Sequence, residues 1–308
     1  MSALSHDRDA QVRLAAFAFL EQQRLAHEHA VPRDVLARGF VFEGQRVPLI
    51  GPPGIVKPAV LPDMPLSITT VPVVEGRARP YADEMSADGF LLYKYRGTDP
   101  AHPDNAGLRR AMHRHAPLVY LYGTVPGSYV PVWPVYVVGD DPPTLTFKVG
   151  VDDTAILGAP GDEVGEGAEA RRAYVTAVTM KRLHQQAFRD RVLRAYRATC
   201  SICRLKHYEL LEAAHILPDG HPLGLPIVPN GLALCKLHHA AFDRYIIGIR
   251  SDLRVEVRPD VLEEPDGPML KHGLQEFHGA SIVVPSRREE RPNADFLAER
   301  YELFRKAS

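Results

Sequence analysis

The sequence predicts an α+β fold divided between two domains. Apolar residues recur at helical spacing near both ends of the chain, whereas short apolar runs broken by Pro and Gly fill residues 41–150. All three cysteines lie between residues 200 and 235, among several histidines. A chain of 308 residues is longer than one hydrophobic core usually supports, so we expect two domains.

The first half is expected to hold a helix followed by a compact sheet or barrel. Apolar spacing predicts an amphipathic helix from Asp7 to about His29, a short helix ending before Gly39, and a further helix over Asn105–His115. The predicted strands are Val47–Ile50, Leu66–Val74, Phe90–Tyr95, Leu118–Tyr122, Tyr129–Val138 and Leu145–Val149.

Proline and glycine indicate how this half ends. Prolines inside the strand-like runs, such as Pro131 and Pro134, favour edges and bulges over a regular sheet. Residues 158–169 are rich in Gly and acidic side chains and almost free of apolar ones, which is typical of a linker. We therefore expect one domain over residues 1–157 and a second over residues 170–308.

The second domain is expected to begin with a helix, clearest over Met180–Arg197. A strand is predicted over Glu209–Ile216. The remaining predicted elements are a helix over Lys236–Arg244, strands over Tyr245–Arg250 and Leu253–Arg258, and a helix over Ala294–Lys306.

Charge is distributed unevenly although the formal net charge is only -1. Residues 171–206 hold ten Lys or Arg and one acid, Asp190, which favours contact with phosphate over a merely solvated face. The first ten residues are polar, and no apolar run approaches the roughly 20 residues that span a bilayer. We expect a cytoplasmic protein without a secretory leader and without a membrane partner.

Two pairs of metal-binding residues share one spacing. Cys200 and Cys203 are separated by two residues, as are Cys235 and His238. Each pair can lie on one turn, so together they predict a closed Cys3His site for a structural Zn2+. The alternative, a redox-active cysteine pair, leaves Cys235 and His238 unexplained and lacks the expected βαβ surroundings.

A second group of residues predicts hydrolysis of phosphodiester bonds. A strand that ends at His215, followed by a hairpin carrying Asn230 and a helix, would place His215 beside His239 and Asp243, because positions i and i+4 share one helix face. A neutral imidazole can deprotonate water near pH 7, and a divalent cation can neutralise charge on a phosphate.

Over residues 195–258 the sequence resembles the HNH family of ββα-metal nucleases. The resemblance rests on the Cys pairs, Ala-His-Ile, Asn-Gly-Leu-Ala-Leu-Cys and His-His-x-x-Phe-Asp in this order. It implies that His215 is the general base and that Asn230 ties the loop and orients His215. It also implies that His239 and Asp243 bind the catalytic Mg2+ or Mn2+.

One position departs from the family pattern. The residue before the general base is commonly an Asp or His that also binds the metal, whereas this chain has Ala214. Glu212 or Asp219 could replace that ligand, or water and phosphate could complete the shell.

The first domain is a candidate reader of the target. The stretch from Tyr81 to Asp99 is similar to the SRA domain, a PUA-like β-barrel fold that flips modified cytosine out of the duplex. The resemblance implies a modified-base pocket at Tyr81, Asp83, Tyr95 and Arg96. From the residues alone, Tyr93 and Tyr95 could instead pack the core on one strand face.

Arginines near both candidate sites are expected to follow the DNA backbone. They are Arg109, Arg110, Arg114, Arg191 and Arg194.

A PUA-like reader followed by an HNH nuclease is the arrangement of McrA-type restriction endonucleases, which the chain resembles. The resemblance implies cleavage of modified double-stranded DNA, with a homodimer to cut both strands. The alternatives are an HNH nuclease for unmodified sequence, a phosphorothioate linkage or modified thymine, a non-catalytic zinc-dependent DNA-binding protein, and an RNA-processing nuclease.

Overall fold

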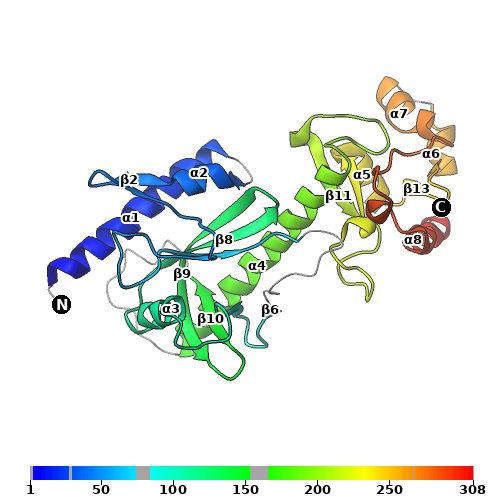
Figure 1. Cartoon of the computed structure of the whole chain (residues 1–308). Coiled ribbons are helices and arrows are strands. Elements are labelled where there is room, and N and C mark those ends of the chain that lie inside the picture. The colour runs from blue at the N-terminus through cyan, green and yellow to red at the C-terminus, as the bar shows by residue number, and fades with distance from the viewer. Residues whose placement is uncertain (1–2, 28–29, 74–83, 153–165, 266, 308) are drawn as a thin grey trace. The chain divides into compact units, whose positions relative to one another are not determined.

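The computed structural model describes residues 3–27, 30–73, 84–152, 166–265 and 267–307. The chain divides into two compact units, Met1–Leu183 (unit 1) and His184–Ser308 (unit 2), and Figure 1 labels many of their elements. The division falls inside helix α4 (Glu166–Ala195), so residues 166–169 of the predicted linker are helical. A domain boundary at residues 158–169 stays a prediction.

Unit 1 is built on a curled sheet that forms part of a barrel. Its strand order is β4-β5-β8-β9-β10-β7-β6, with β1 paired to β9 outside that path. Neighbours run antiparallel except β5 and β8, which are parallel. The strands are β1 (Val31–Pro32), β4 (Ile55–Val56), β5 (Ser67–Thr70), β6 (Glu84–Met85), β7 (Leu91–Lys94), β8 (Leu118–Val125), β9 (Ser128–Asp141) and β10 (Thr146–Val151).

The predicted strands over residues 66–74, 90–95, 118–122, 129–138 and 145–149 each overlap one of these, with different ends. Val47–Ile50 is wrong as a strand, since only Val47 is extended, at the end of β3 (Gln45–Val47), which pairs with β2 (Phe40–Phe42). Leu49 and Ile50 are buried outside a strand, which accounts for the apolar run, and the Leu49 amide donates to the carbonyl of Leu36.

One of the two prolines of β9 lies at an irregularity. Leu118 of β8 pairs with Val135 and Tyr120 pairs with Val132, so two β9 residues, Trp133 and Pro134, stand opposite one residue of β8. A bulge leaves a residue without a ladder hydrogen bond, which suits a proline that has no N–H. The expectation of a bulge is confirmed at Pro134. It is wrong at Pro131, which pairs in register with Leu121, and β9 is not an edge strand because it lies between β8 and β10.

Besides the first part of α4, three helices accompany the sheet in the described part of unit 1. They are α1 (Ala3–Ala26), α2 (Arg33–Arg38) and α3 (Pro103–His113). Val12, Ala16 and Leu20 of α1 belong to one apolar cluster with Val119 and Leu121 of β8. These apolar residues recur every four positions and form one face of the helix, and burial of that face holds α1 to the sheet.

A buried arginine fixes α1 more specifically. The Arg13 guanidinium is 2% exposed; it pairs with Asp9 at 2.6 Å and donates to the carbonyls of Pro65 and Pro117 at 3.0 and 2.8 Å. These partners compensate the desolvated charge.

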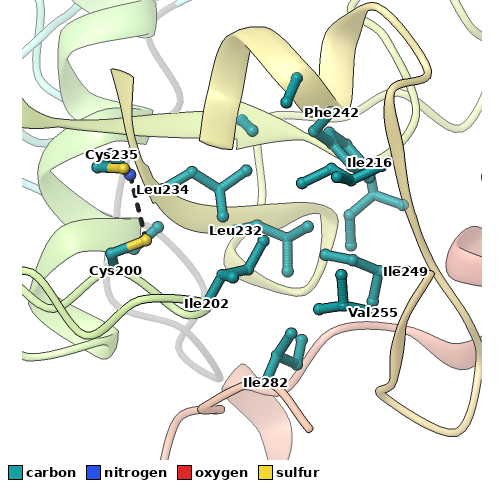
Figure 2. Packing of buried hydrophobic residues seen from close by; sticks show 14 of the residues in the cluster. Cys200, Ile202, Ile216, Leu232, Leu234, Cys235, Phe242, Ile249, Val255 and Ile282 are labelled. Carbon is teal, nitrogen blue, oxygen red and sulfur yellow. Dashed lines mark hydrogen bonds between the residues drawn. The ribbon is translucent and has the colours of Figure 1, made fainter. Parts of the chain in front are cut away.

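Unit 2 surrounds a second apolar core. Figure 2 shows Ile202, Leu232, Phe242 and Ile249 packed together, with Cys200 at one end of the cluster. The elements after α4 are β11 (Leu211–His215), β12 (Gly231–Cys235), α5 (Lys236–Asp243), β13 (Ile247–Ile249), β14 (Val255–Val257), α6 (Pro259–Glu263), α7 (Pro268–Gly273) and α8 (Ala294–Ala307).

Two hairpins, β11–β12 and β13–β14, are antiparallel and form separate two-stranded sheets. The predicted strand over Glu209–Ile216 begins late, because residues 208–210 form a 3₁₀ turn. Within the described parts of both units, none of the helices has the length and apolarity to cross a bilayer.

Candidate active site

The four predicted zinc ligands come together. The Sγ atoms of Cys203 and Cys235 are 3.8 Å apart, and His238 Nδ1 lies 3.6 Å from Cys200 Sγ and 3.2 Å from Cys235 Sγ. Tetrahedral Zn2+ with bonds of 2.0–2.3 Å places sulfurs about 3.8 Å apart and sulfur and nitrogen about 3.5 Å apart. The donor set therefore fits zinc in chemistry and in spacing.

The cluster is held by neighbours that suit a metal site. The other ring nitrogen of His238, Nε2, is 2.9 Å from the carbonyl of Gly273, to which it donates, so Nδ1 keeps its lone pair for a metal. The thiols of Cys203 and Cys235 donate to Cys200 and lower the pKa of Cys200, whereas the contacts with Cys200 and Cys235 raise the pKa of Cys203. A thiolate is the form that binds zinc.

His215 ends strand β11 in a half-buried position. Its ring stacks on Phe188 of α4, with centroids 4.0 Å apart and planes 21° apart. Its Nε2 atom is buried and has no hydrogen-bond partner among the described residues. Burial lowers the pKa of His215 from its usual value; Asp219 raises it, His239 lowers it and Asp243 raises it. The imidazole is therefore neutral near pH 7 and lies within the field of His239 and Asp243.

Asn230 fastens the loop that follows His215. Its side chain is fully buried, accepts from the Leu217 amide at 2.9 Å, and donates to the carbonyls of Leu217 and Leu225 at 3.0 and 3.1 Å. Its own carbonyl accepts from the Ile216 amide at 2.9 Å. Every side-chain bond of Asn230 goes to backbone, so this residue fixes the path of the chain directly after His215.

His239 lies between two carboxylates. Its Nδ1 is 2.7 Å from Glu212 Oε2, and its Nε2 is 3.3 Å from Asp243 Oδ2, one helical turn further along α5. The histidine is 22% exposed and Asp243 is 56% exposed, so both can be reached from solvent. An imidazole nitrogen and a carboxylate oxygen at this separation form a donor pair that suits a hard divalent cation.

The structure adds two residues for which the sequence carries no signal. Phe188 covers one face of the His215 ring. Arg300 of α8 donates to the carbonyl of Phe242 at 3.0 Å and approaches Asp243 Oδ1 to 3.9 Å. Each contact joins residues far apart in sequence and follows no local spacing.

The proposed base pocket is only partly described. Tyr81 and Asp83 lie outside the described residues. Tyr95 is 1% exposed and stacks on Phe147, and its hydroxyl donates to Asp140 and accepts from Arg109. Tyr93 is also buried, as the packing alternative expects.

Arg96 is near the same network but faces solvent. It is exposed and paired with Asp104, and its backbone is held by the fully buried Asn105. Its position at the surface leaves the guanidinium accessible to a ligand.

The five predicted backbone arginines fall into two groups. Arg109 is half-buried and paired with Asp140 at 2.6 Å, and Arg191 donates to the Pro226 carbonyl at 2.6 Å, so both have structural partners. The others, Arg110, Arg114 and Arg194, are exposed, although Arg110 also donates to the carbonyl of Asp63 at 3.0 Å.

Comparison with known proteins agrees with this geometry in part. The model of the family described as HNH endonuclease matches residues 200–250. Among solved structures, the chain is similar to the "Modification dependent TagI restriction endonuclease", at 16% identity and over 78% of this chain and 82% of that chain; the TM-score of 0.28 is too low to support a shared fold. The curated proteins contain no match.

The matched residues include the whole Cys3His cluster together with His215, Asn230 and His239. The chain thus carries an HNH endonuclease domain and is an enzyme that hydrolyses phosphodiester bonds.

Proposed function

We propose that this protein is a modification-dependent DNA endonuclease of a cytoplasmic restriction system. In this proposal unit 2 cuts double-stranded DNA, and unit 1 recognises a modified cytosine that has been flipped out of the duplex. The observation that carries the nuclease role is the convergence of a neutral, half-buried His215 with the donor pair His239 and Asp243.

His215 is suited to the role of general base. Its lowered pKa keeps the imidazole unprotonated at neutral pH, so it can take a proton from the attacking water. Phe188 fixes the ring plane, and Asn230 fixes the loop after His215. Such positioning brings a base and its substrate together without an entropy cost during the reaction.

His239 and Asp243 would hold the catalytic Mg2+ or Mn2+. A bound divalent ion supplies charge neutralisation at the phosphate and the leaving oxygen. Cys200, Cys203, Cys235 and His238 would hold a structural Zn2+, since their donor atoms lie within 4.8 Å of one another and four protein ligands leave no position for water or substrate.

The reader role of unit 1 rests on the SRA-like stretch and on accessible cationic groups. Arg96 is exposed beside the Tyr95 network, and Arg110 and Arg114 are exposed on and just after α3. Their exposure supports a role in contacting phosphate around a recognised base. Cutting both strands with one active site per chain further favours paired binding or a homodimer.

The deciding experiment is cleavage of one plasmid prepared with cytosine, 5-methylcytosine or 5-hydroxymethylcytosine, in Mg2+ or Mn2+. We expect the intact enzyme to cut only modified forms, and His215→Ala to bind them with unchanged affinity and zinc content but without cutting. Equal cutting of all three forms would leave a nuclease without a modified-cytosine reader. Cutting by His215→Ala at the rate of the intact enzyme would remove His215 as the base.

A further inference from the structure

We propose that Glu212 is a positioning residue of the active site: its carboxylate holds the His239 imidazole in the tautomer whose Nε2 lone pair is free to bind a divalent metal. This inference rests on the proposed metal-dependent nuclease function. It assigns Glu212 a role different from that of a ligand replacing the family residue at Ala214.

The contact that carries the inference joins two elements. Glu212 lies on strand β11, His239 lies on helix α5, and Glu212 Oε2 is 2.7 Å from His239 Nδ1. The two residues are separated by 27 positions, so only the packing of α5 against the β11–β12 hairpin creates the pair. The distance is that of a charge-assisted hydrogen bond.

This hydrogen bond specifies where the imidazole proton resides. An ionised carboxylate only accepts hydrogen bonds, so Nδ1 must be the nitrogen that carries hydrogen and donates. A metal-bound imidazole is neutral and has one N–H. The proton on Nδ1 therefore leaves the lone pair of the ring on Nε2.

The Nε2 atom faces the second proposed ligand. Asp243 Oδ2 is 3.3 Å from it. Adjacent donors on an octahedral Mg2+ at about 2.1 Å stand roughly 3 Å apart, so the two atoms are spaced as neighbours on one ion. A carboxylate that fixes a histidine ligand through its other nitrogen is a recurring feature of protein metal sites.

The same geometry argues against binding of the metal by Glu212 Oε2, the oxygen that accepts the hydrogen bond from His239. The two ring nitrogens of an imidazole point in different directions, and Glu212 occupies Nδ1 while Asp243 faces Nε2. An ion bound by Nε2 and Asp243 would lie on the far side of the ring from Glu212 Oε2.

A role in folding alone is also a poor account of the pair. Glu212 is 41% exposed and His239 is 22% exposed. Ion pairs this accessible to water contribute little to stability. Removing the Glu212 carboxylate should therefore change the tautomer of His239 more than the stability of the fold.

The test uses the full-length zinc-loaded protein and three variants, Glu212→Gln, Glu212→Ala and the control Glu209→Ala. Glu209 is an exposed acid three positions earlier, outside the contact with His239. One readout is the 15N spectrum of the His239 side chain, assigned with His239→Asn, which reports the tautomer before any metal is added. The second is Mn2+ affinity by calorimetry, without DNA.

We expect His239 in the intact protein to be protonated at Nδ1. Glu212→Ala should yield a mixture of tautomers and weaken Mn2+ binding about tenfold. Glu212→Gln, whose amide oxygen still accepts from Nδ1, should keep the tautomer and bind Mn2+ within about threefold of the intact protein. Glu209→Ala should match the intact protein.

Two results would overturn the inference. Equal loss of Mn2+ affinity in the Gln and Ala variants with an unchanged tautomer would make Glu212 a ligand, and unchanged tautomer and affinity in Glu212→Ala would leave it without a role. Neither result depends on cleavage, whereas failure of the intact enzyme to cut any DNA would count against the proposed function alone.

Discussion

At the scale of single residues, the environment of His215 determines its chemistry. The sequence supplies a histidine at the end of a strand. The largest cause of its lowered pKa is burial among the residues of unit 2. Phe188 covers the ring and leaves Nε2 without a partner among the residues described. A histidine at the same position on an open surface would titrate near 6.5 and would be partly protonated at neutral pH.

The rate of cleavage should therefore depend on pH in a defined direction. In the proposed function His215 is the general base and must be neutral to act, so the acidic limb of the rate profile should have its midpoint below 6.5, the ordinary value for histidine. Single-turnover rates measured across that range, with zinc content followed in parallel, provide the check. A midpoint above 6.5 would contradict the assignment.

The same shift links pH to stability. Because the folded pKa of His215 is lower than the unfolded one, its neutral form stabilises the fold fully above the unfolded value. That contribution is lost as pH falls through the folded pKa.

Tyr95 offers a second prediction at this scale. Its ring fills the core beside Phe147, so Tyr95→Phe keeps the packing and removes only the hydroxyl contacts with Asp140 and Arg109. We expect the variant to fold normally and to lose several-fold of its preference for modified over unmodified plasmid. An unchanged preference would remove the Tyr95 hydroxyl from base recognition.

At the scale of elements, the active site depends on a close approach of strand β12 to helix α4. Gly231 pairs with His215 across the hairpin, and a Cβ at this position would lie 2.4 Å from Val192 Cγ2 and 3.0 Å from Phe188 Cζ. The backbone at Gly231 is ordinary and extended, with φ of -128°. Glycine is needed here for space and not for conformation.

Gly231→Ala should therefore displace α4 and disturb the stack of Phe188 on His215. We expect a loss of about 1–3 kcal/mol in the free energy of unfolding, the usual cost of overpacking. Denaturant unfolding would measure it against Gly220→Ala, where an added Cβ meets nothing within 4 Å. Equal stability of the two variants would show that the close approach of β12 to α4 does not require glycine at position 231.

At the scale of the whole molecule, the Cys3His cluster brings together parts of unit 2 that are distant in sequence. Cys200 and Cys203 follow α4, whereas Cys235 ends β12 and His238 lies in α5. His238 Nε2 also reaches the carbonyl of Gly273 at the end of α7. A metal at this point would fix the hairpin that carries His215.

Cys203→Ala should release zinc and unfold unit 2, because metal binding contributes directly to folding at such sites. Metal analysis and far-UV circular dichroism would follow both effects. The matched control is Ser201→Ala in the same turn, since the buried Ser201 hydroxyl has no hydrogen-bond partner among the described residues. Full zinc content in Cys203→Ala would exclude this residue as a ligand.

The elements and motifs that depend on local spacing could be predicted from the amino-acid sequence. The two ligand pairs, the strand ending at His215 and the helix that places His239 and Asp243 on one face all follow from residues a few positions apart. Such patterns are local because turns and helix faces repeat over three or four residues.

The contacts between distant segments could not be predicted from the sequence and emerge from the folded chain. The stack of Phe188 on His215 and the pairing of Glu212 with His239 join different elements, and the burial of Tyr95 depends on Phe147 and Asp140. The predicted strand over Val47–Ile50 is wrong for the same reason. Its apolar residues after Val47 are buried by distant partners, and their spacing does not distinguish a strand from other buried chain. Packing selects these contacts by shape and charge across the whole unit, and no short spacing records them.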